Sequence, residues 1–311
     1  MERINPREVY GDTLVRLGEN NSNIVVLDAD LSKSTKTCKF AEKFPGRFFN
    51  IGIAEANMIS VAAGLASCGK TVFASTFAVF VPGKTYDQIR MSVAYSNMNV
   101  KLFSTHAGVS VGKDGVSHQM LEDIALMRVL PNMKIFAPSD PFQTGKIVEL
   151  MAENYGPMYA RVGREAMYPI YQEEELSDLA IGKSVLIKEG EDVTIVAHGM
   201  MVGKALNVHE ELKKQGVNAE VIDMWTIKPL DENRILSSAR KTGRVITVEE
   251  HSVIGGIGSA VAELLSENRV DVAFKRMGIN DVFCESGDPI DLLKKYRLTE
   301  KDIVENAKKL M

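Results

Sequence analysis

Residues Ile51-Gly-Ile-Ala-Glu55-Ala-Asn-Met58, continued by Val61-Ala-Ala-Gly-Leu-Ala66 and Thr71-Val-Phe-Ala-Ser-Thr-Phe77-Ala-Val-Phe80, decide the fold of this chain. The first part predicts a helix of small and apolar residues, and the last part predicts a strand that ends in two phenylalanines. Glu55 opens the helix, so we expect its side chain to point into protein rather than into water. Because an unpaired buried carboxylate is costly, Glu55 needs a partner or stays protonated. The plain alternative is that Glu55 caps the helix.

Around this stretch, apolar runs of strand length alternate with amphipathic runs of helix length. This alternation predicts an α/β protein with mostly parallel sheets. The expected strands of the first half are 24–27, 48–51, 71–74, 100–103, 134–136 and 158–161. Asn5-Pro6-Arg7-Glu8 predicts the start of the first helix, with Asn5 as its cap and Pro6 at its first position.

Between Gly163 and Glu191 the alternation breaks into irregular sequence, and a second alternation begins at Val193. We therefore expect two domains, residues 1–170 and 191–311, joined by a linker at 171–190. The second domain should contain strands at 193–197, 219–222, 244–248 and 270–274, with helices at 201–215, 231–240, 259–266, 290–295 and 300–310.

Bulk properties narrow the classes of protein. A chain of 311 residues is long enough for two packed domains, and its net charge of −4 gives no reason to expect nucleic acid or a membrane surface as partner. No apolar run approaches the length of a membrane span, and the first residues lack the core of a signal peptide. The three cysteines, Cys38, Cys68 and Cys284, fit reduced thiols in the cytoplasm.

The most specific motif is the glycine-rich loop Ser104-Thr-His106-Ala-Gly-Val-Ser-Val-Gly112-Lys-Asp114-Gly-Val-Ser-His118-Gln119. With it, residues 50–138 resemble the pyrimidine-binding domain of transketolases. The rest of the chain from Asp192 resembles their C-terminal domain, through Trp225-Thr-Ile-Lys-Pro-Leu-Asp231, Thr247-Val-Glu-Glu-His251 and Gly255-Gly-Ile-Gly258. The resemblance implies thiamine diphosphate as cofactor and transfer of two-carbon ketol units between sugar phosphates, as in the pentose phosphate pathway.

One element of transketolases has no counterpart here. Transketolases hold magnesium and the cofactor diphosphate with a Gly-Asp-Gly element and a downstream Asn. This sequence contains no such element, and the nearest matches, Gly11-Asp12-Thr and Gly287-Asp288-Pro, lie in the wrong context. The chain therefore resembles the C-terminal half of a transketolase made as a separate subunit. This implies a partner, an N-terminal subunit that holds Mg²⁺ and shares the cofactor, in a heterotetramer of two plus two chains.

The resemblance also assigns roles around the cofactor. Glu55 would hydrogen-bond the pyrimidine ring nitrogen, since a carboxyl in an apolar niche can share a proton with a weakly basic ring nitrogen. Phe80 would stack on the ring, Phe77 would form a pocket wall, and Asp30 would lie at the cofactor-side interface. The plain alternative is that both phenylalanines are core residues at a strand end. Where many transketolases carry a third aromatic residue, this chain has Val81-Pro-Gly83-Lys84.

On the substrate side, the resemblance places His118 by the donor carbonyl, Asp114 on a sugar hydroxyl and His106 near the substrate phosphate. Arg161 would bind that phosphate, since arginine offers planar, bidentate donors. Arg7 and Ser34 match further phosphate contacts of the family. A zinc site formed by His106, Asp114 and His118 is an alternative, but its spacing matches no usual ligand pattern.

Other functions remain open at this point. The chain could be the beta subunit of a 2-oxoacid dehydrogenase decarboxylating component, which shares the architecture, or a non-catalytic paralogue. Deoxyxylulose-phosphate synthase is related too, but it carries both halves on one chain.

Gly255-Gly-Ile-Gly258 lacks the third glycine of a dinucleotide fingerprint. We interpret Glu249-Glu250-His251 as a domain contact or a surface loop.

Overall fold

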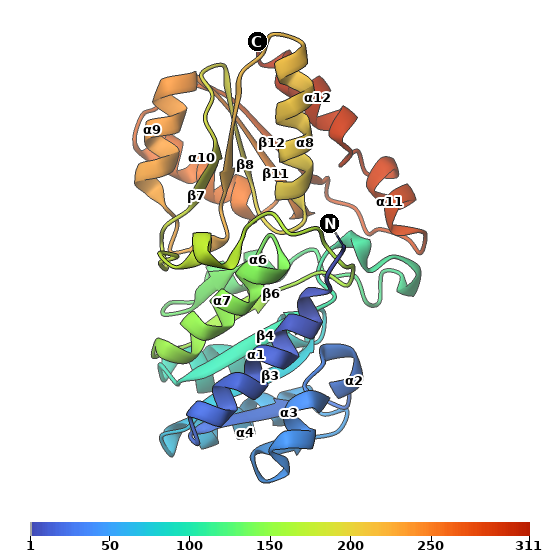
Figure 1. Ribbon diagram of the computed structural model, residues 1–311, viewed down its shortest axis with the longest axis vertical. Helices are drawn as coiled ribbons and strands as arrows, with labels where there is room; N and C mark the ends of the chain where they lie inside the picture. The colour runs from blue at the N-terminus through green and yellow to red at the C-terminus, as the bar shows by residue number, and fades with distance from the viewer. Residues whose placement is uncertain (1) are drawn as a thin grey trace.

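The computed structural model describes residues 2–311, which form two α/β units, one above the other along the long axis of the molecule (Figure 1). The first unit is built on a seven-stranded sheet of order β10-β5-β6-β4-β3-β1-β2. Its strands are parallel except β10, which pairs antiparallel with β5. They span β1 (Ile24–Asp28), β2 (Phe48–Asn50), β3 (Thr71–Phe77), β4 (Val100–Thr105), β5 (Lys134–Phe136), β6 (Met158–Arg161) and β10 (Thr226–Lys228).

Alternating side chains of these strands pack on helices at the two faces of the sheet. On one face, Val26 and Phe73 pack in a core with Tyr10 of α1; on the other, Leu27 and Ala74 pack with Met58 of α4. Asn5 caps α1 as predicted, because its side chain accepts a hydrogen bond from the Arg7 amide. The helices are α1 (Pro6–Asn20), α2 (Ser32–Thr35), α3 (Cys38–Lys43), α4 (Glu55–Ser67), α5 (Val81–Gln88), α6 (Asp123–Arg128) and α7 (Pro141–Glu153).

The second unit repeats this architecture with a five-stranded sheet of order β12-β11-β8-β9-β7. Only its edge strand β7 is antiparallel. The strands are β7 (Val185–Lys188), β8 (Val193–Ala197), β9 (Ala219–Asp223), β11 (Arg244–Ser252) and β12 (Ala273–Ile279). The helices are α8 (Met201–Lys214), α9 (Glu232–Thr242), α10 (Ile257–Glu267), α11 (Pro289–Lys295) and α12 (Glu300–Lys309). The expected α/β class with two mostly parallel sheets is confirmed.

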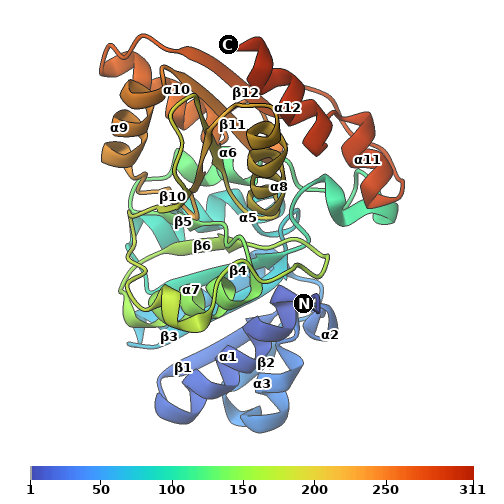
Figure 2. The same cartoon turned by 45° about the horizontal axis from the view of Figure 1, so that its top comes forward.

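Two strands were not predicted. β10 is a three-residue strand next to Pro229, too short for an alternating pattern, and it crosses from the second half of the chain into the first sheet. Figure 2 shows it beside β5, at the edge of the first sheet that faces the second unit. β7 lies in the stretch expected to be irregular and is half-buried along its length. Both strands gain their structure from pairing with distant residues rather than from local sequence.

The two units are packed together through apolar side chains. One continuous core cluster contains Leu102 and Ile135 of the first sheet together with Val196 and Ile222 of the second. Among residues 2–311, no helix is both long and apolar enough to cross a membrane.

Candidate active site

Polar and aromatic side chains gather where the parallel strands of the first sheet end. Glu55 follows β2, Phe77 is the last residue of β3, and His106 comes directly after β4. Open parallel sheets bind ligands at this carboxyl edge. The sequence therefore brings together Glu55, Phe77, Phe80 and His106 through strand register rather than through nearness along the chain.

Glu55 is the first residue of α4 and is only 4% exposed. Ala54 occupies the N-cap position, so the alternative in which Glu55 caps the helix is wrong. The Nζ of Lys84 donates a hydrogen bond of 2.8 Å to Oε2 of Glu55. Of the two expectations for this buried carboxyl group, a partner or a proton, the structure shows a partner.

Phe77 and Phe80 form an aromatic cluster with the two histidines of the glycine-rich loop. The two phenylalanine rings lie nearly parallel, with centroids 6.0 Å apart. His106 stacks on Phe77 with a centroid separation of 3.8 Å, and His118 meets Phe80 edge-on at 5.6 Å. The two phenylalanines and the two imidazole groups therefore form one aromatic cluster at this edge of the sheet.

The loop from His106 to Gln119 turns back on itself several times. Gly108, Gly112 and Gly115 have φ values of 89°, 79° and 73°, which residues with a Cβ atom rarely adopt. Gly108 pairs with Met120 in an isolated antiparallel bridge that closes the loop. Behind the loop, the carboxyl group of Glu250, from β11 of the second unit, accepts a hydrogen bond from the Ser110 amide.

A cluster of cations lies beside this loop. The guanidinium group of Arg7 donates hydrogen bonds to the carbonyl oxygens of Ser34, at 2.9 Å, and of Arg164, at 3.1 Å. Nη1 of Arg164 in turn lies 3.3 Å from Oδ2 of Asp114. Arg7, Ser34, Asp114 and Arg164 therefore lie together, and Arg164 is a residue that the resemblance did not assign.

His106 responds to these charges. Burial, and then Arg7, Arg164 and His118 in decreasing order, lower its pKa to about 3. The imidazole is therefore neutral at physiological pH. Its Nδ1 lies 2.9 Å from the hydroxyl oxygen of Thr105, which helps to fix the ring on Phe77.

Arg161, expected to bind the substrate phosphate, lies elsewhere. Its side chain is 5% exposed, and its Nε is 2.9 Å from Oδ2 of the fully buried Asp123. Its Nη2 donates to the carbonyl oxygen of Glu250 at 3.2 Å. These contacts use the guanidinium group inside the protein, and the structure does not bring Arg161 together with Arg7, Ser34 and Asp114. The segment Arg161-Val-Gly-Arg164 contains two arginines that differ in burial: the side chain of Arg161 is buried and that of Arg164 is partly exposed.

Asp30 lies at the same carboxyl edge, in the turn after β1. Its φ is 64°, and its Oδ1 accepts a hydrogen bond of 2.9 Å from the side-chain amide of Asn50. It is exposed. The pair joins the ends of β1 and β2 next to the loop that leads to Glu55.

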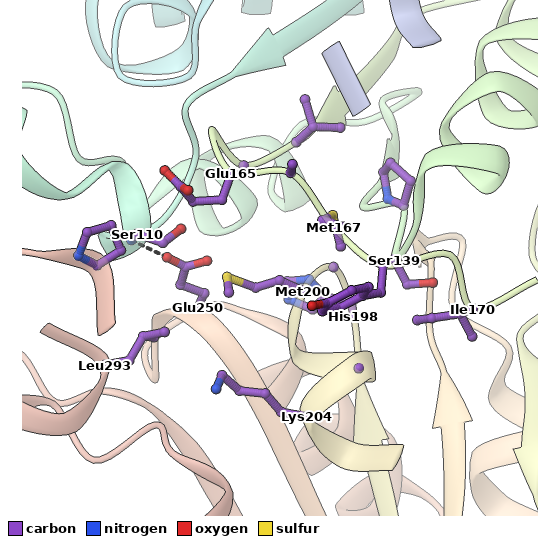
Figure 3. A pocket seen from close by; sticks show the side chains of 18 of the residues that line it. Ser110, Ser139, Glu165, Met167, Ile170, His198, Met200, Lys204, Glu250 and Leu293 are labelled. Carbon is purple, nitrogen blue, oxygen red and sulfur yellow. Dashed lines mark hydrogen bonds between the residues drawn. The ribbon is translucent and has the colours of Figure 1, made fainter. Parts of the chain in front are cut away.

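A cavity of about 830 Å³ lies between the two units. Figure 3 shows that both units line it, the first with Ser110, Ser139 and Glu165 and the second with His198, Lys204 and Glu250, and that Ser110 and Glu250 meet directly. Burial lowers the pKa of His198 and raises that of Glu250. His198 had not been singled out from the sequence, although the run Ala197-His198-Gly199 at the end of a predicted strand is the signal that could have found it.

Glu249-Glu250-His251 lies in β11 and is buried. Glu249 accepts hydrogen bonds from the amides of Ile257 and Gly258 at the start of α10, while Glu250 reaches the first unit at Ser110. Of the two interpretations offered, the domain contact is right and the surface loop is wrong.

The geometry indicates which ligands fit. In the part of the chain that the structure describes, residues 2–311, no group of three or more His, Cys, Asp or Glu side chains could hold a metal ion. The buried carboxylate of Glu55 next to Phe80 suits a flat nitrogen heterocycle, which could stack on the ring and share a proton with the carboxylate. The cationic cluster around Arg7 and Arg164 suits an anionic group.

Comparison with known protein families gives two matches. The family described as "Transketolase, pyrimidine binding domain" matches residues 2–169, and "Transketolase, C-terminal domain" matches residues 182–303. A 6-deoxy-6-sulfo-D-fructose transketolase subunit of a Clostridium species is 42% identical over 301 residues, 97% of this chain and 92% of the relative. Human transketolase is 40% identical over 309 residues, which are 98% of this chain but 49% of the human protein.

A solved structure is also similar along its whole length. It is described as a split gene transketolase, an inactive beta4 tetramer, and is 52% identical with a TM-score of 0.92. The alignment covers 99% of this chain and 98% of that one.

Proposed function

Because the chain belongs to the transketolase family, we propose that it is the C-terminal subunit of a two-chain transketolase, which transfers two-carbon ketol units between sugar phosphates. The observation that carries the proposal is the buried Glu55 carboxylate next to Phe80 at the carboxyl edge of the first sheet. An apolar niche with one carboxylate and an aromatic wall fits the aminopyrimidine of thiamine diphosphate.

Thiamine diphosphate, when bound, supplies the carbanion chemistry that breaks and forms the carbon–carbon bond. The protein's part is to hold and tune the pyrimidine ring. Glu55 would share a proton with the ring nitrogen, Phe80 would stack on the ring and Phe77 would close the wall behind it. Asp30, at the end of the neighbouring strand β1, faces the same edge, where a second chain would contribute the rest of the site.

The glycine-rich loop binds the sugar. His118, which lies edge-on to Phe80, reaches the donor carbonyl and the neighbouring hydroxyl, and Asp114 accepts a hydrogen bond from a sugar hydroxyl. His106 lies deeper, on Phe77, between the sugar and the cationic cluster. These roles follow the resemblance and are supported by the proximity of the three side chains to the aromatic wall or to Arg164.

For the substrate phosphate we propose Arg164 with Arg7 and Ser34, in place of Arg161. Arg164 is partly exposed and its pair with Asp114 is long, so its guanidinium group can turn to a ligand. Arg161 is buried and ion-paired. Phosphate recognition requires a cation that can reach solvent, and Arg164 meets this requirement.

The diphosphate and Mg²⁺ require residues that this sequence does not supply, so we propose a partner. Human transketolase is about twice as long as the segment that it shares with this chain. An N-terminal subunit would supply the missing half, in a heterotetramer of two plus two chains. The split-gene relative that is described as an inactive tetramer of one subunit type supports this division.

The test is to assay the purified subunit alone and mixed with the chain encoded by the adjacent reading frame. We expect no ketol transfer by the subunit alone and turnover after mixing with thiamine diphosphate and Mg²⁺. The donors should include xylulose 5-phosphate, 6-deoxy-6-sulfofructose and the apulose 4-phosphate series, because relatives are named for the last two.

Each alternative gives a different result in this test. Reductive acylation of a lipoyl domain without sugar transfer would favour the 2-oxoacid dehydrogenase subunit. A stable complex that binds the cofactor but transfers no ketol unit from any of the donors would favour a non-catalytic paralogue. Full activity of the isolated subunit would contradict the two-chain proposal.

A further inference from the structure

The segment Val81-Pro-Gly83-Lys84, which stands where many transketolases carry an aromatic residue, contains the partner of Glu55. Lys84 lies in the first turn of α5, and its side chain is 52% exposed whereas that of Glu55 is 5% exposed. Its Nζ is 2.8 Å from Oε2 of Glu55 and 5.3 Å from the centroid of the Phe80 ring. The ammonium group thus touches the carboxylate and also lies over the aromatic face.

These two distances define a point in the site. A ligand nitrogen that hydrogen-bonds Oε2 of Glu55 while its ring stacks on Phe80 lies within reach of the oxygen that Lys84 holds and over the same ring. The Lys84 ammonium group and such a nitrogen therefore compete for one place. Lys84 is also a cation next to an aromatic face, which is a favourable arrangement of its own.

We propose that Lys84 is an internal substitute for the aminopyrimidine: it pairs with the Glu55 carboxyl group and orients it in the cofactor-free subunit, and the cofactor displaces it on binding. The proposal rests on the function proposed above for Glu55 and Phe80. It assigns a positioning role to a residue for which the resemblance offers none.

The energetics fit such an exchange. An unpaired carboxylate as buried as Glu55 would be strongly unfavourable, so the empty site requires a cation or a proton. Lys84 meets this need from the protein surface, because its four-carbon stem lets the ammonium group return to water without leaving a buried charge. When a ring nitrogen replaces it, Glu55 and that nitrogen share a proton taken up from solvent, so Glu55 keeps a partner and Lys84 regains its hydration. The exchange therefore costs much less than breaking a fully buried ion pair.

The first test measures the reactivity of Lys84 by competitive acetylation with acetic anhydride and peptide mass spectrometry. Lys214, whose side chain is 75% exposed, serves as the internal standard. In the isolated subunit, Glu55→Gln should raise the relative reactivity of Lys84 by about twofold to fivefold, because a partly exposed ion pair protects by that much. Equal reactivity in wild type and variant would show that no pair forms, and would overturn the proposal.

The second test uses the assembled two-chain complex with and without thiamine diphosphate and Mg²⁺, with cofactor binding measured separately by calorimetry. Binding should raise the reactivity of Lys84 towards that of Lys214. A complex that binds the cofactor while Lys84 stays protected overturns the displacement but leaves the proposed function intact. A complex that binds no cofactor overturns both.

A matched pair of variants gives a second readout. Lys84→Met removes the competing ammonium group and should lower the dissociation constant of the cofactor by about twofold to fivefold. Lys70→Met is the control, since Lys70 lies at the surface and contacts Asn23 instead. Weaker cofactor binding by the Lys84→Met complex would mean that Lys84 helps to bind the cofactor and does not compete with it. This result would overturn the proposal.

Discussion

The two sheets of this protein end in similar polar groups and use them in opposite ways. At the carboxyl edge of the first sheet, the buried side chain of Glu55 pairs with a half-exposed lysine, Lys84. At the carboxyl edge of the second sheet, Glu249 and Glu250 accept backbone hydrogen bonds inside the protein. The same position in an α/β sheet thus holds an acid paired with an exposed side chain in one unit and acids fixed by backbone amides in the other.

The difference lies in what the carboxylates face. Glu249 and Glu250 accept hydrogen bonds from backbone amides, which belong to the start of α10 and to the loop of the first unit. A ligand could not replace these donors without moving the backbone. Glu55 has one side-chain donor, the half-exposed Lys84. Burial alone therefore does not separate the two kinds of acid; the exposure of the partner does.

The largest expected effect comes from Glu55→Gln. The amide keeps the shape of the side chain but cannot share a proton with the pyrimidine, so turnover of the assembled complex should fall by about a hundredfold to ten-thousandfold. Steady-state ketol transfer measures this, with circular dichroism to check the fold. Glu19→Gln, which removes a surface partner of Lys43, should leave turnover unchanged. Activity of Glu55→Gln within about twofold of wild type would make Glu55 structural, like Glu249.

Arg161 and Arg164 should respond to substitution in different ways. Arg161→Ala leaves the buried Asp123 without its cation, so the free energy of unfolding should fall by about 3–5 kcal/mol, measured with urea. Arg164→Ala should leave the fold stable but weaken phosphorylated donors by about 1.5–3 kcal/mol, seen as a higher KM that hydroxypyruvate does not show. If Arg161→Ala folds normally and shows the phosphate-specific defect, Arg161 returns as the phosphate ligand.

Glu250→Ala tests whether the second unit supports the loop of the first. The substitution removes the acceptor of the buried Ser110 amide, which should lower the free energy of unfolding by about 1–3 kcal/mol. Hydrogen exchange of residues 106–119 should also become faster than in wild type. Glu300→Ala is the matched control, because this partly exposed acid of the same cavity pairs with Lys204 and should cost less than about 1 kcal/mol. Unchanged hydrogen exchange in residues 106–119 would show that Glu250 of the second unit does not stabilise the loop of the first.

The smallest effect concerns His106 and pH. Its folded pKa, about 3, lies below the usual value of 6.5, so the unfolded chain binds the proton first. Stability from this group is therefore complete above pH 6.5 and should fall by about 1 kcal/mol per pH unit as the pH decreases below 6.5. Urea unfolding at pH 7 and pH 5 should show a smaller pH difference for His106→Gln than for wild type. An imidazole NMR signal of His106 that titrates near pH 6.5 would contradict this.

The sequence was sufficient for the α/β class and for most strands, because buried parallel strands form continuous apolar runs that periodicity detects. β10 could not be predicted, because three residues are too few to show an alternation of apolar and polar side chains. Its pairing partner also lies about ninety residues away along the chain. The burial of Arg161 could not be predicted from spacing, since it depends on Asp123 lying within reach of its guanidinium group. Likewise, Lys84 follows Glu55 by 29 positions, and only the packing of α5 against α4 brings the two side chains together.

β10 also affects the order in which the molecule can be completed. Residues 226–228 close the edge of the first sheet beside β5, so a growing chain that has reached only the end of β6 exposes β5 as an unpaired edge. That edge stays open during synthesis until some seventy further residues have been made, and an open edge favours pairing with other chains. For the same reason, a protease cut in the stretch between β6 and β7 should not release the first unit. The severed pieces would remain joined by β10 and by the shared apolar core.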